Sequence, residues 1–349
     1  MTQLNNIFIG NKVVKQAFLN DAVIYQSNGW EPTPSTMQRV FSKTYTEIPD
    51  MGGTVSVKVD SKGNIISARR KGLYKTDADG KLLWQKTIFA SNSNFGITSM
   101  IVNKNDNIFC GGNDATFMQI NPYTGEVIKK IDLKSKYNVN SIAAIAADSN
   151  QIYAITKPPI NFLNIDLNGN VISVTPWTSN YSNYTPSSMA TGDFKHMYIV
   201  IYNLEHSYDT YAFRLDKRNP NSYVTIVSSV LGGFQSRVVA DSIGNAYITY
   251  TGELHKYLSN SNLNFAWKTD SPISNGGYFS ELAIDQQDNV YVFDRYNICK
   301  YSSDGTLLWY NDMWHNNIYL EMVCDKNNLI VSSGYQNDLT KLLNLVKKS

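Results

Sequence analysis

The sequence of 349 residues has little of what several common classes of protein require. Only 17% of its residues are charged, and 31 Lys and Arg nearly balance 29 Asp and Glu, so the net charge is +2. A nucleic-acid binder normally carries a strong basic excess, and this balance argues against that class. No apolar run approaches the ~18 residues that a membrane-spanning helix needs, so no membrane insertion is expected.

Cysteines and targeting signals are equally scarce. The three cysteines, Cys110, Cys299 and Cys324, are odd in number and far apart, which does not support a disulfide framework. Each lies in an apolar run typical of a strand, so we expect buried free thiols. The N-terminus lacks a basic start followed by an apolar core, and therefore predicts synthesis in a cytoplasm without a secretory signal.

Familiar catalytic and metal-binding motifs are missing as well. The four histidines have no metal-ligand spacing, and no HExxH, GxSxG or phosphate-binding loop occurs. These absences favour a protein with no metal, no cofactor and no enzymatic activity. A pair of carboxylates for glycoside hydrolysis stays open, with Asp294 and Glu205 as possible members, because such pairs need not be close in sequence.

A repeat runs through the body of the chain. The segment DGKLLW, residues 79–84, returns as DGTLLW, residues 304–309, and weaker copies lie between them at spacings of 45, 44 and 42 residues. About 20 residues ahead of this element, seven copies of a strand–turn–strand pattern begin near residues 57, 100, 144, 189, 238, 282 and 322. A period of ~40–50 residues with four short strands is typical of a β-propeller blade. The tryptophans in the repeat, Trp84, Trp267 and Trp309, are expected to pack between blades.

The repeat predicts an all-β fold, a seven-bladed β-propeller closed by an N-terminal strand. The last copy has room for only three strands before the sequence ends, and VFSKT (40–44) resembles the outer strand LWQKT (83–87) of the first blade. We therefore expect residues 37–47 to complete the last blade. Six blades with extensions stay open as the alternative. The predicted organisation is a small β-hairpin-like anchor (1–27), a proline-containing linker (28–36) and the propeller (37–349).

Longer, irregular loops are expected on one face of such a ring, where function tends to lie. Aromatic side chains there can stack on sugar rings, and arginines can bind anionic groups such as phosphates. The candidate ligand-binding residues on this loop face are Arg69, Arg70, Trp177, Tyr181, Tyr184, Tyr278, Arg295, Tyr296, Trp314 and His315. For each single residue the alternative is structural, because tyrosines also cap loop ends and arginines are also simply solvated.

The N-terminal segment contains its own small tandem repeat. FIGNKVV (8–14) returns as FLNDAVI (18–24), and each copy is an apolar pair, a turn signal and another apolar pair. So short a segment cannot be stable alone and should attach to something else. The candidate attachment residues are Phe8, Ile9, Val13, Phe18, Leu19, Val23 and Tyr25.

This tandem repeat resembles the N-terminal strand repeats of tail and baseplate proteins of phages that infect Gram-positive bacteria. The first copy carries the resemblance with Ile9, Gly10, Asn11, Lys12 and Val14, and the match covers about 20 of the 349 residues. The resemblance implies a unit that attaches to other tail or baseplate proteins of the virion and a homotrimer. Some receptor-binding proteins of such phages also carry a propeller head that recognises wall teichoic acid.

The leading hypothesis is therefore a structural phage tail or baseplate protein, located in the virion, that acts in host adsorption. Its propeller would bind a host cell-wall glycan such as teichoic acid. Two alternatives remain at this point: a propeller enzyme that degrades wall or capsule polysaccharide, and a purely structural baseplate component.

Overall fold

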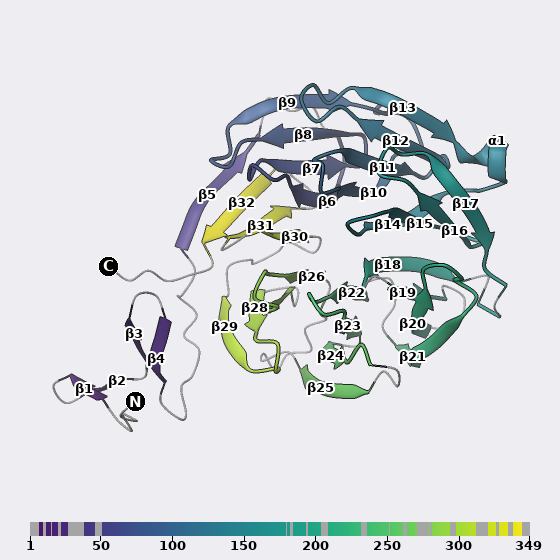
Figure 1. The fold of residues 1–349 in the computed structure, drawn as a ribbon. Helices are drawn as coiled ribbons and strands as arrows, with labels where there is room; N and C mark the ends of the chain where they lie inside the picture. Colours follow the sequence, from purple (N-terminus) through teal and green to yellow (C-terminus); the bar gives the residue numbers. More distant parts are fainter. Residues whose placement is uncertain are drawn as a thin grey trace.

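The computed structural model is a ring of small antiparallel sheets with two hairpins before it (Figure 1). It describes residues 7–9, 12–14, 16–19, 22–26, 38–45, 51–178, 180–181, 184–192, 195–203, 209–231, 236–250, 252–260, 264–270, 279, 281–293, 298–311, 320–325, 328–333 and 338–343. Within these ranges, no helix has the length and apolar character needed to cross a membrane.

The N-terminal repeat forms two separate hairpins. Strand β1 (Ile7–Ile9) pairs with β2 (Lys12–Val14), and β3 (Gln16–Leu19) pairs with β4 (Ala22–Gln26). Phe8 lies opposite Val13, and Phe18 lies opposite Val23. The strand interpretation of this segment is thus confirmed. Within the described residues, none of these four strands pairs with a strand of the ring.

Six sheets follow along the chain, each made of four consecutive strands, and we call them blades 1 to 6. Blade 1 contains β6 (Thr54–Val59), β7 (Ile65–Arg69), β8 (Gly72–Thr76) and β9 (Leu82–Thr87). Blade 2 contains β10 (Ile97–Val102), β11 (Ile108–Gly112), β12 (Thr116–Ile120) and β13 (Val127–Asp132). Blade 3 contains β14 (Ile142–Ala147), β15 (Ile152–Thr156), β16 (Asn161–Ile165) and β17 (Val171–Pro176). The short helix α1 (Leu133–Tyr137) joins blades 2 and 3.

The second half of the ring continues the same order. Blade 4 contains β18 (Thr185–Thr191), β19 (His196–Tyr202), β20 (Asp209–Asp216) and β21 (Tyr223–Leu231). Blade 5 contains β22 (Arg237–Ala240), β23 (Ala246–Tyr250), β24 (Glu253–Tyr257) and β25 (Phe265–Asp270). Blade 6 contains β26 (Glu281–Ile284), β27 (Val290–Phe293), β28 (Ile298–Tyr301) and β29 (Leu307–Asn311).

The remaining sheet is built from both ends of the chain, and we call it the composite sheet. It consists of β30 (Leu320–Asp325), β31 (Asn328–Ser333), β32 (Asp338–Leu343) and then β5 (Gln38–Thr44). β5 pairs antiparallel with β32, with Thr44 opposite Asp338, and the two strands lie side by side in Figure 1. The prediction of seven blades from the sequence repeats therefore needs a correction. Within the described residues, one continuous stretch of chain completes each of six blades, not seven. The composite sheet instead combines strands from the two ends of the chain.

Burial along the strands follows the position of each strand in its blade. Every residue of the second strands β7, β11, β15 and β23 is buried. The outermost strand β9 instead alternates between half-buried and exposed residues. Inner strands are covered on both faces by neighbouring blades, whereas an outermost strand meets solvent, which explains why the inner strands are continuous apolar runs.

An aspartate organises the tight turn between the first two strands of several blades. In blade 5, Asp241 accepts hydrogen bonds from the backbone N–H of Asn245 (2.7 Å), from its side-chain amide (2.8 Å) and from the hydroxyl of Tyr247 (3.3 Å). In blade 1, Asp60 is bound in the same way by Asn64. The turn is thus held by local side-chain chemistry, which is why its repeat is visible in the sequence.

The repeated tryptophans pack between blades, as predicted. The indole N–H of Trp84 donates to the carbonyl of Pro122 in blade 2 (3.1 Å), and that of Trp267 donates to the carbonyl of Ser303 in blade 6 (3.2 Å). Gly125 has a φ of +74° beside Trp84, and a Cβ atom there would lie 2.6 Å from the indole. The turn therefore requires glycine both for its backbone conformation and for the close approach of the ring.

Candidate functional site

A cavity of about 450 Å³ lies at the centre of the ring. It is lined by the innermost strand of every blade and of the composite sheet: β6, β10, β14, β18, β22, β26 and β30. Residues that are far apart in sequence meet here only because the ring closes. The cavity thus offers a site that belongs to no single repeat.

One position of the repeat recurs in each innermost strand, and we call these seven residues the cavity ring. This position lies four residues before the Asp, Asn or Gly residue with which the following tight turn begins. The members are Ser56, Ser99, Ala144, Ser188, Arg237, Glu281 and Glu321. All seven line the cavity. Three are hydroxyls and three are charged, although a position facing the middle of a propeller needs neither for packing.

The serines of the cavity ring join neighbouring blades. Ser99 Oγ accepts a hydrogen bond from the backbone N–H of Ile145 (3.0 Å), and Ser188 Oγ accepts one from that of Val238 (3.2 Å). Each partner lies in the next blade, one residue after the next member of the ring. The serine side of the cavity therefore has a structural role that explains its residue types.

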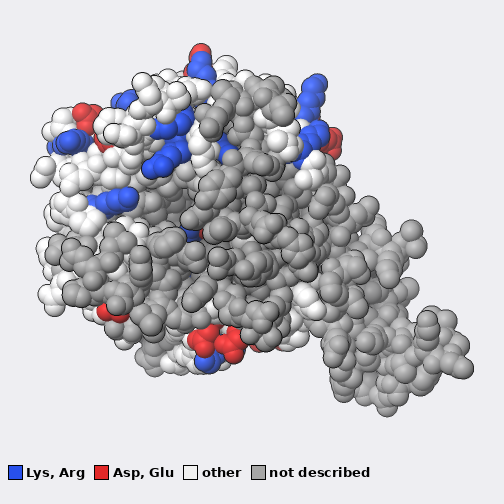
Figure 2. Space-filling view, turned by 180° about the vertical axis from the view of Figure 1, so that it is seen from behind, with Lys and Arg blue, Asp and Glu red and all other residues white. Residues whose placement is uncertain are grey.

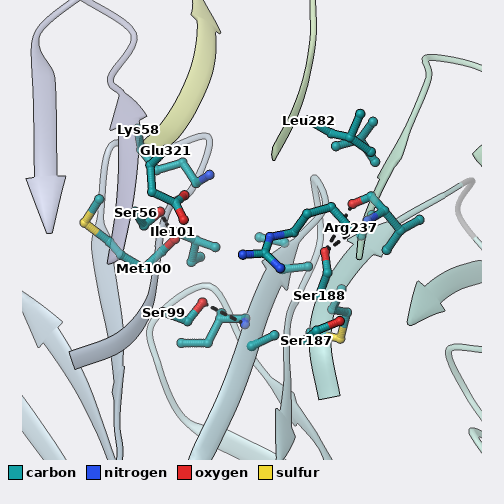
Figure 3. Close-up of a pocket in the computed structure, with 18 of the residues that line it drawn as sticks. Ser56, Lys58, Ser99, Met100, Ile101, Ser187, Ser188, Arg237, Leu282 and Glu321 are labelled. Carbon is teal, nitrogen blue, oxygen red and sulfur yellow. Dashed lines mark hydrogen bonds between the residues drawn. The ribbon is translucent and has the colours of Figure 1, made fainter. Parts of the chain in front are cut away.

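The charged side of the cavity ring comes from blades 5 and 6 and the composite sheet. A guanidinium nitrogen of Arg237 lies 2.8 Å from a carboxylate oxygen of Glu281, which is 8% exposed. Glu321, half-buried, follows in the next sheet, so two carboxyl groups stand in consecutive positions. Figure 3 shows Arg237 reaching into the cavity, with Lys58 of β6 and Glu321 lying near each other on another side of it. Structural pairing explains Arg237 and Glu281, but not a second glutamate beside the first.

The two glutamates have unusual acidities. Burial, reinforced by the charge of Glu281, raises the pKa of Glu321 to about 8, although Arg237 and Lys58 act in the opposite direction. Burial also raises the pKa of Glu281, opposed by Arg237 and Lys58. Burial alone would lower the pKa of Arg237, but the nearby Glu281 and Glu321 outweigh it and raise that pKa. Glu321 therefore holds a proton near neutral pH while Arg237 stays charged.

This arrangement can bind a ligand through hydrogen bonds, and it can also transfer protons. A neutral carboxylic acid beside an ion pair donates a hydrogen bond, and carboxyl groups with a raised pKa are typical of acid–base sites. Within the described ranges, no group of three or more His, Cys, Asp or Glu side chains could hold a metal ion. The prediction of buried free thiols is confirmed for Cys110 and Cys299, whereas the free Cys324 is half-buried. Burial raises the pKa of the Cys110 thiol, which disfavours it as a nucleophile.

We predict that Glu321 makes stability fall as pH rises. Its pKa is about 8 in the folded protein against 4.5 when unperturbed, so between these values the folded state keeps a proton that the unfolded state releases. The free energy of unfolding therefore decreases through this window, by less than about 1.4 kcal/mol per pH unit, and Glu321 causes no further change above it.

Chemical unfolding of wild type and Glu321→Gln at several pH values measures this contribution. The free energy of unfolding of wild type should fall relative to that of the variant between about pH 5 and 8. Parallel curves for the two proteins would contradict the assignment. Glu253→Gln is a control with the opposite sign, because Lys268 holds the pKa of Glu253 below its usual value.

The structure gives several of the sequence-predicted site residues internal partners. Arg69 is 1% exposed, and its guanidinium donates to the carbonyl of Gly52 (2.9 Å) and to the hydroxyl of Thr54 (2.6 Å). Arg70, next to it, is exposed. Neither lines the cavity, and their role in ligand binding stays a prediction.

The predicted aromatic residues of blades 3 and 4 come together in one cluster. Trp177 is 3% exposed, and its ring lies 5.4 Å from that of Phe213 and 6.3 Å from that of Tyr181. Tyr181 and Tyr184 are half-buried, with ring centres 5.4 Å apart. This cluster is part of the core between two blades, so Trp177 has a packing role whether or not it meets a ligand. Tyr278, Arg295, Tyr296, Trp314 and His315 lie outside the described residues.

The charged members of the cavity ring were missed from sequence. Their signal is present, because each stands at a fixed distance before the turn of its repeat. When the repeats are aligned, hydroxyl and charged residues occur at an innermost position, where apolar residues are expected. The prediction instead concentrated on loops, where charged and aromatic residues are common for many reasons.

Comparison with known proteins shows what the ring is. No family model and no curated protein matches the sequence. Virginiamycin B lyase from Staphylococcus aureus superposes with a TM-score of 0.70 and 9% identity, over 88% of this chain and 99% of that one. The β-propeller domain of Cps50 (Swd1) from Myceliophteria thermophila superposes with a TM-score of 0.65 and 9% identity, over 88% and 99%. The fold is a β-propeller. At such identities the likeness shows the fold alone.

The comparison also corrects the prediction that the protein is not an enzyme. A streptogramin B lyase superposes on this propeller with a TM-score of 0.69 and 10% identity, over 90% of this chain and 99% of that one. Structures with this fold thus include enzymes, and the missing catalytic motifs do not exclude catalysis here. No activity is carried over from these lyases.

Proposed function

We propose that this propeller belongs to a phage tail or baseplate protein that acts in host adsorption and binds a cell-surface glycan, such as wall teichoic acid, at its central cavity. The cavity carries this proposal. Charged and hydroxyl side chains line it, including Lys58, Arg237, Glu281 and Glu321, and such groups suit a polar, hydroxyl-rich ligand.

The position of the charged residues supports access from one face. Arg237 and Glu281 are the first residues of β22 and β26, and Glu321 is the second residue of β30. They therefore lie at the end of the ring where the connections between blades arrive. Loops held by a rigid scaffold at such an end are the common place for recognition.

The hairpins supply the attachment part of the proposal. Two small sheets with no strand pairing to the ring, within the described residues, suit a unit that packs against another protein. Attachment to other tail or baseplate proteins through residues 1–27, and a homotrimer in the virion, rest on the family resemblance of this segment. Several copies per particle would strengthen weak binding of single glycan units.

A second candidate function is cleavage of wall or capsule polysaccharide. The observation that favours it is the pair Glu281 and Glu321, in which a carboxyl group with a pKa of about 8 stands next to an ion-paired one. A protonated acid beside a carboxylate is the combination that glycoside hydrolysis uses.

Fluorescently labelled full-length protein and a variant without residues 1–27 should both coat host cells and sediment with purified wall polymer. Binding of the truncated ring identifies the propeller as the adhesin, because the anchor is then dispensable. Release of reducing ends from the same polymer, lost in Glu321→Gln, would favour the enzyme instead. If neither form binds or cleaves wall material, a purely structural role replaces both proposals.

A further inference from the structure

Two ionisable groups of the cavity have no direct partner among the residues that the structure describes. Within the described part of the chain, no hydrogen bond or ion pair joins the amine of Lys58 or the carboxyl of Glu321, although each lines the cavity and is half-buried. By contrast, Arg237 and Glu281 form an ion pair at 2.8 Å. Half-buried ionisable groups without partners are costly, and a ligand that supplies the missing partner recovers that cost.

The surroundings of Glu321 fix the charge of the site. Glu281 faces it from β26, Arg237 from β22 and Lys58 from β6. β31, the strand paired with β30, has no ionisable residue. The residues of β10, β14 and β18 that line the cavity are also uncharged. With Glu321 protonated, Arg237 and Lys58 contribute two positive charges and Glu281 one negative charge. The cavity is therefore complementary to a single negative charge.

Resting on the proposed function, we propose that the cavity binds one anionic group of the glycan, a phosphodiester or a carboxylate, between the Lys58 amine and the Glu321 carboxylic acid. The ammonium donates charge-assisted hydrogen bonds to the anion, and the carboxylic acid donates its proton to another oxygen. Arg237 attracts the anion electrostatically while it keeps its ion pair with Glu281.

This site responds to pH through Glu321. Its pKa of about 8 means that the acid donates at neutral pH and becomes a carboxylate in mildly basic solution. A carboxylate has no proton to donate and repels the anion, so affinity should fall up to tenfold per pH unit above that pKa. The amide that Glu321→Gln introduces donates at every pH, so this variant should keep its affinity where wild type loses it.

Calorimetric titration of the full chain with dimethyl phosphate and with glucuronate tests the site, because neither probe changes charge between about pH 6 and 9. Glucose is the neutral control. We expect binding of at least one anion at pH 7, about tenfold weaker binding in Lys58→Met, and no change in Lys104→Met, which removes an exposed lysine in the turn of blade 2. The anion that binds with the higher affinity then shows whether the site prefers a phosphodiester or a carboxylate.

Three results would overturn the inference: no anion binding in folded wild type, equal losses in Lys58→Met and Lys104→Met, or a pH dependence that Glu321→Gln retains. Thermal unfolding of each variant checks that it is folded. Failure here is distinct from failure of the proposed function. Coating of host cells without anion binding refutes the anion site alone, whereas anion binding without coating refutes adsorption alone.

Discussion

Removal of residues 1–45 is expected to destabilise the propeller severely, whereas removal of residues 1–27 leaves its melting temperature unchanged. The longer deletion takes away β5, the outer strand of the composite sheet, and leaves β32 with an open edge. It also removes Tyr45, which is 3% exposed and donates its hydroxyl to the carbonyl of Gly80 (2.7 Å) in blade 1. Loss of one buried aromatic side chain alone costs about 3–5 kcal/mol, and the lost strand pairing adds to this.

Thermal and chemical unfolding of the two truncated proteins, followed by circular dichroism, measures the effect. The shorter deletion is the matched control, because it removes the hairpins and keeps β5. Equal melting temperatures for both truncations would mean that β5 contributes nothing to the closure of the ring. Tyr45→Phe separates the hydroxyl from the ring and should cost only about 1 kcal/mol.

Arg237→Met is expected to lower the free energy of unfolding by about 3 kcal/mol near pH 8, with a much smaller effect near pH 5. The substitution leaves Glu281 without its cation and next to Glu321, and breaking a buried ion pair from one side costs about 3–5 kcal/mol. The lower end applies because the Arg237 side chain is 25% exposed. Loss of the cation raises the pKa of both glutamates further, so the penalty vanishes as acid protonates them.

The double variant Arg237→Met with Glu281→Leu tests the cause. It removes both charges of the pair, and should recover most of the stability that the single variant loses. Arg70→Met, a change of the same kind at an exposed arginine, should stay within about 0.5 kcal/mol of wild type. If the single variant is equally destabilised at both pH values, packing of the arginine stem rather than charge explains the loss.

What the sequence predicted was set by local chemistry. The Asp241 turn is held by Asn245 and Tyr247, all within one short segment, so its copies are recognisable as a repeat. The tryptophan of the outer strand likewise meets a turn at a fixed place in the next blade, as Trp84 meets Pro122. Strands, turns and contacts between blades therefore follow from residue types at a constant period.

What the sequence did not predict depends on the closed ring. Lys58, Arg237, Glu281 and Glu321 come from four sheets, and nothing local indicates that their side chains meet. Trp177 shows the opposite difficulty. It follows β17 in a loop-like segment that suits ligand binding, yet it is buried against Phe213. Whether a loop aromatic faces outward or into the core is decided by packing from another blade. Figure 2 shows charged side chains at several separate places near the edge of the molecule, and the sequence alone gives no reason to prefer one of these places.

The composite sheet also constrains when this protein can finish folding. Gln38 pairs with Leu343, so β5 leaves the ribosome long before β32, the strand with which it pairs. Blades 1 to 6 can each form as their own strands emerge, whereas β5 must wait until β32 has been synthesised. Until then the growing chain exposes an unpaired edge at either side of the gap, where a chaperone or another nascent copy could bind.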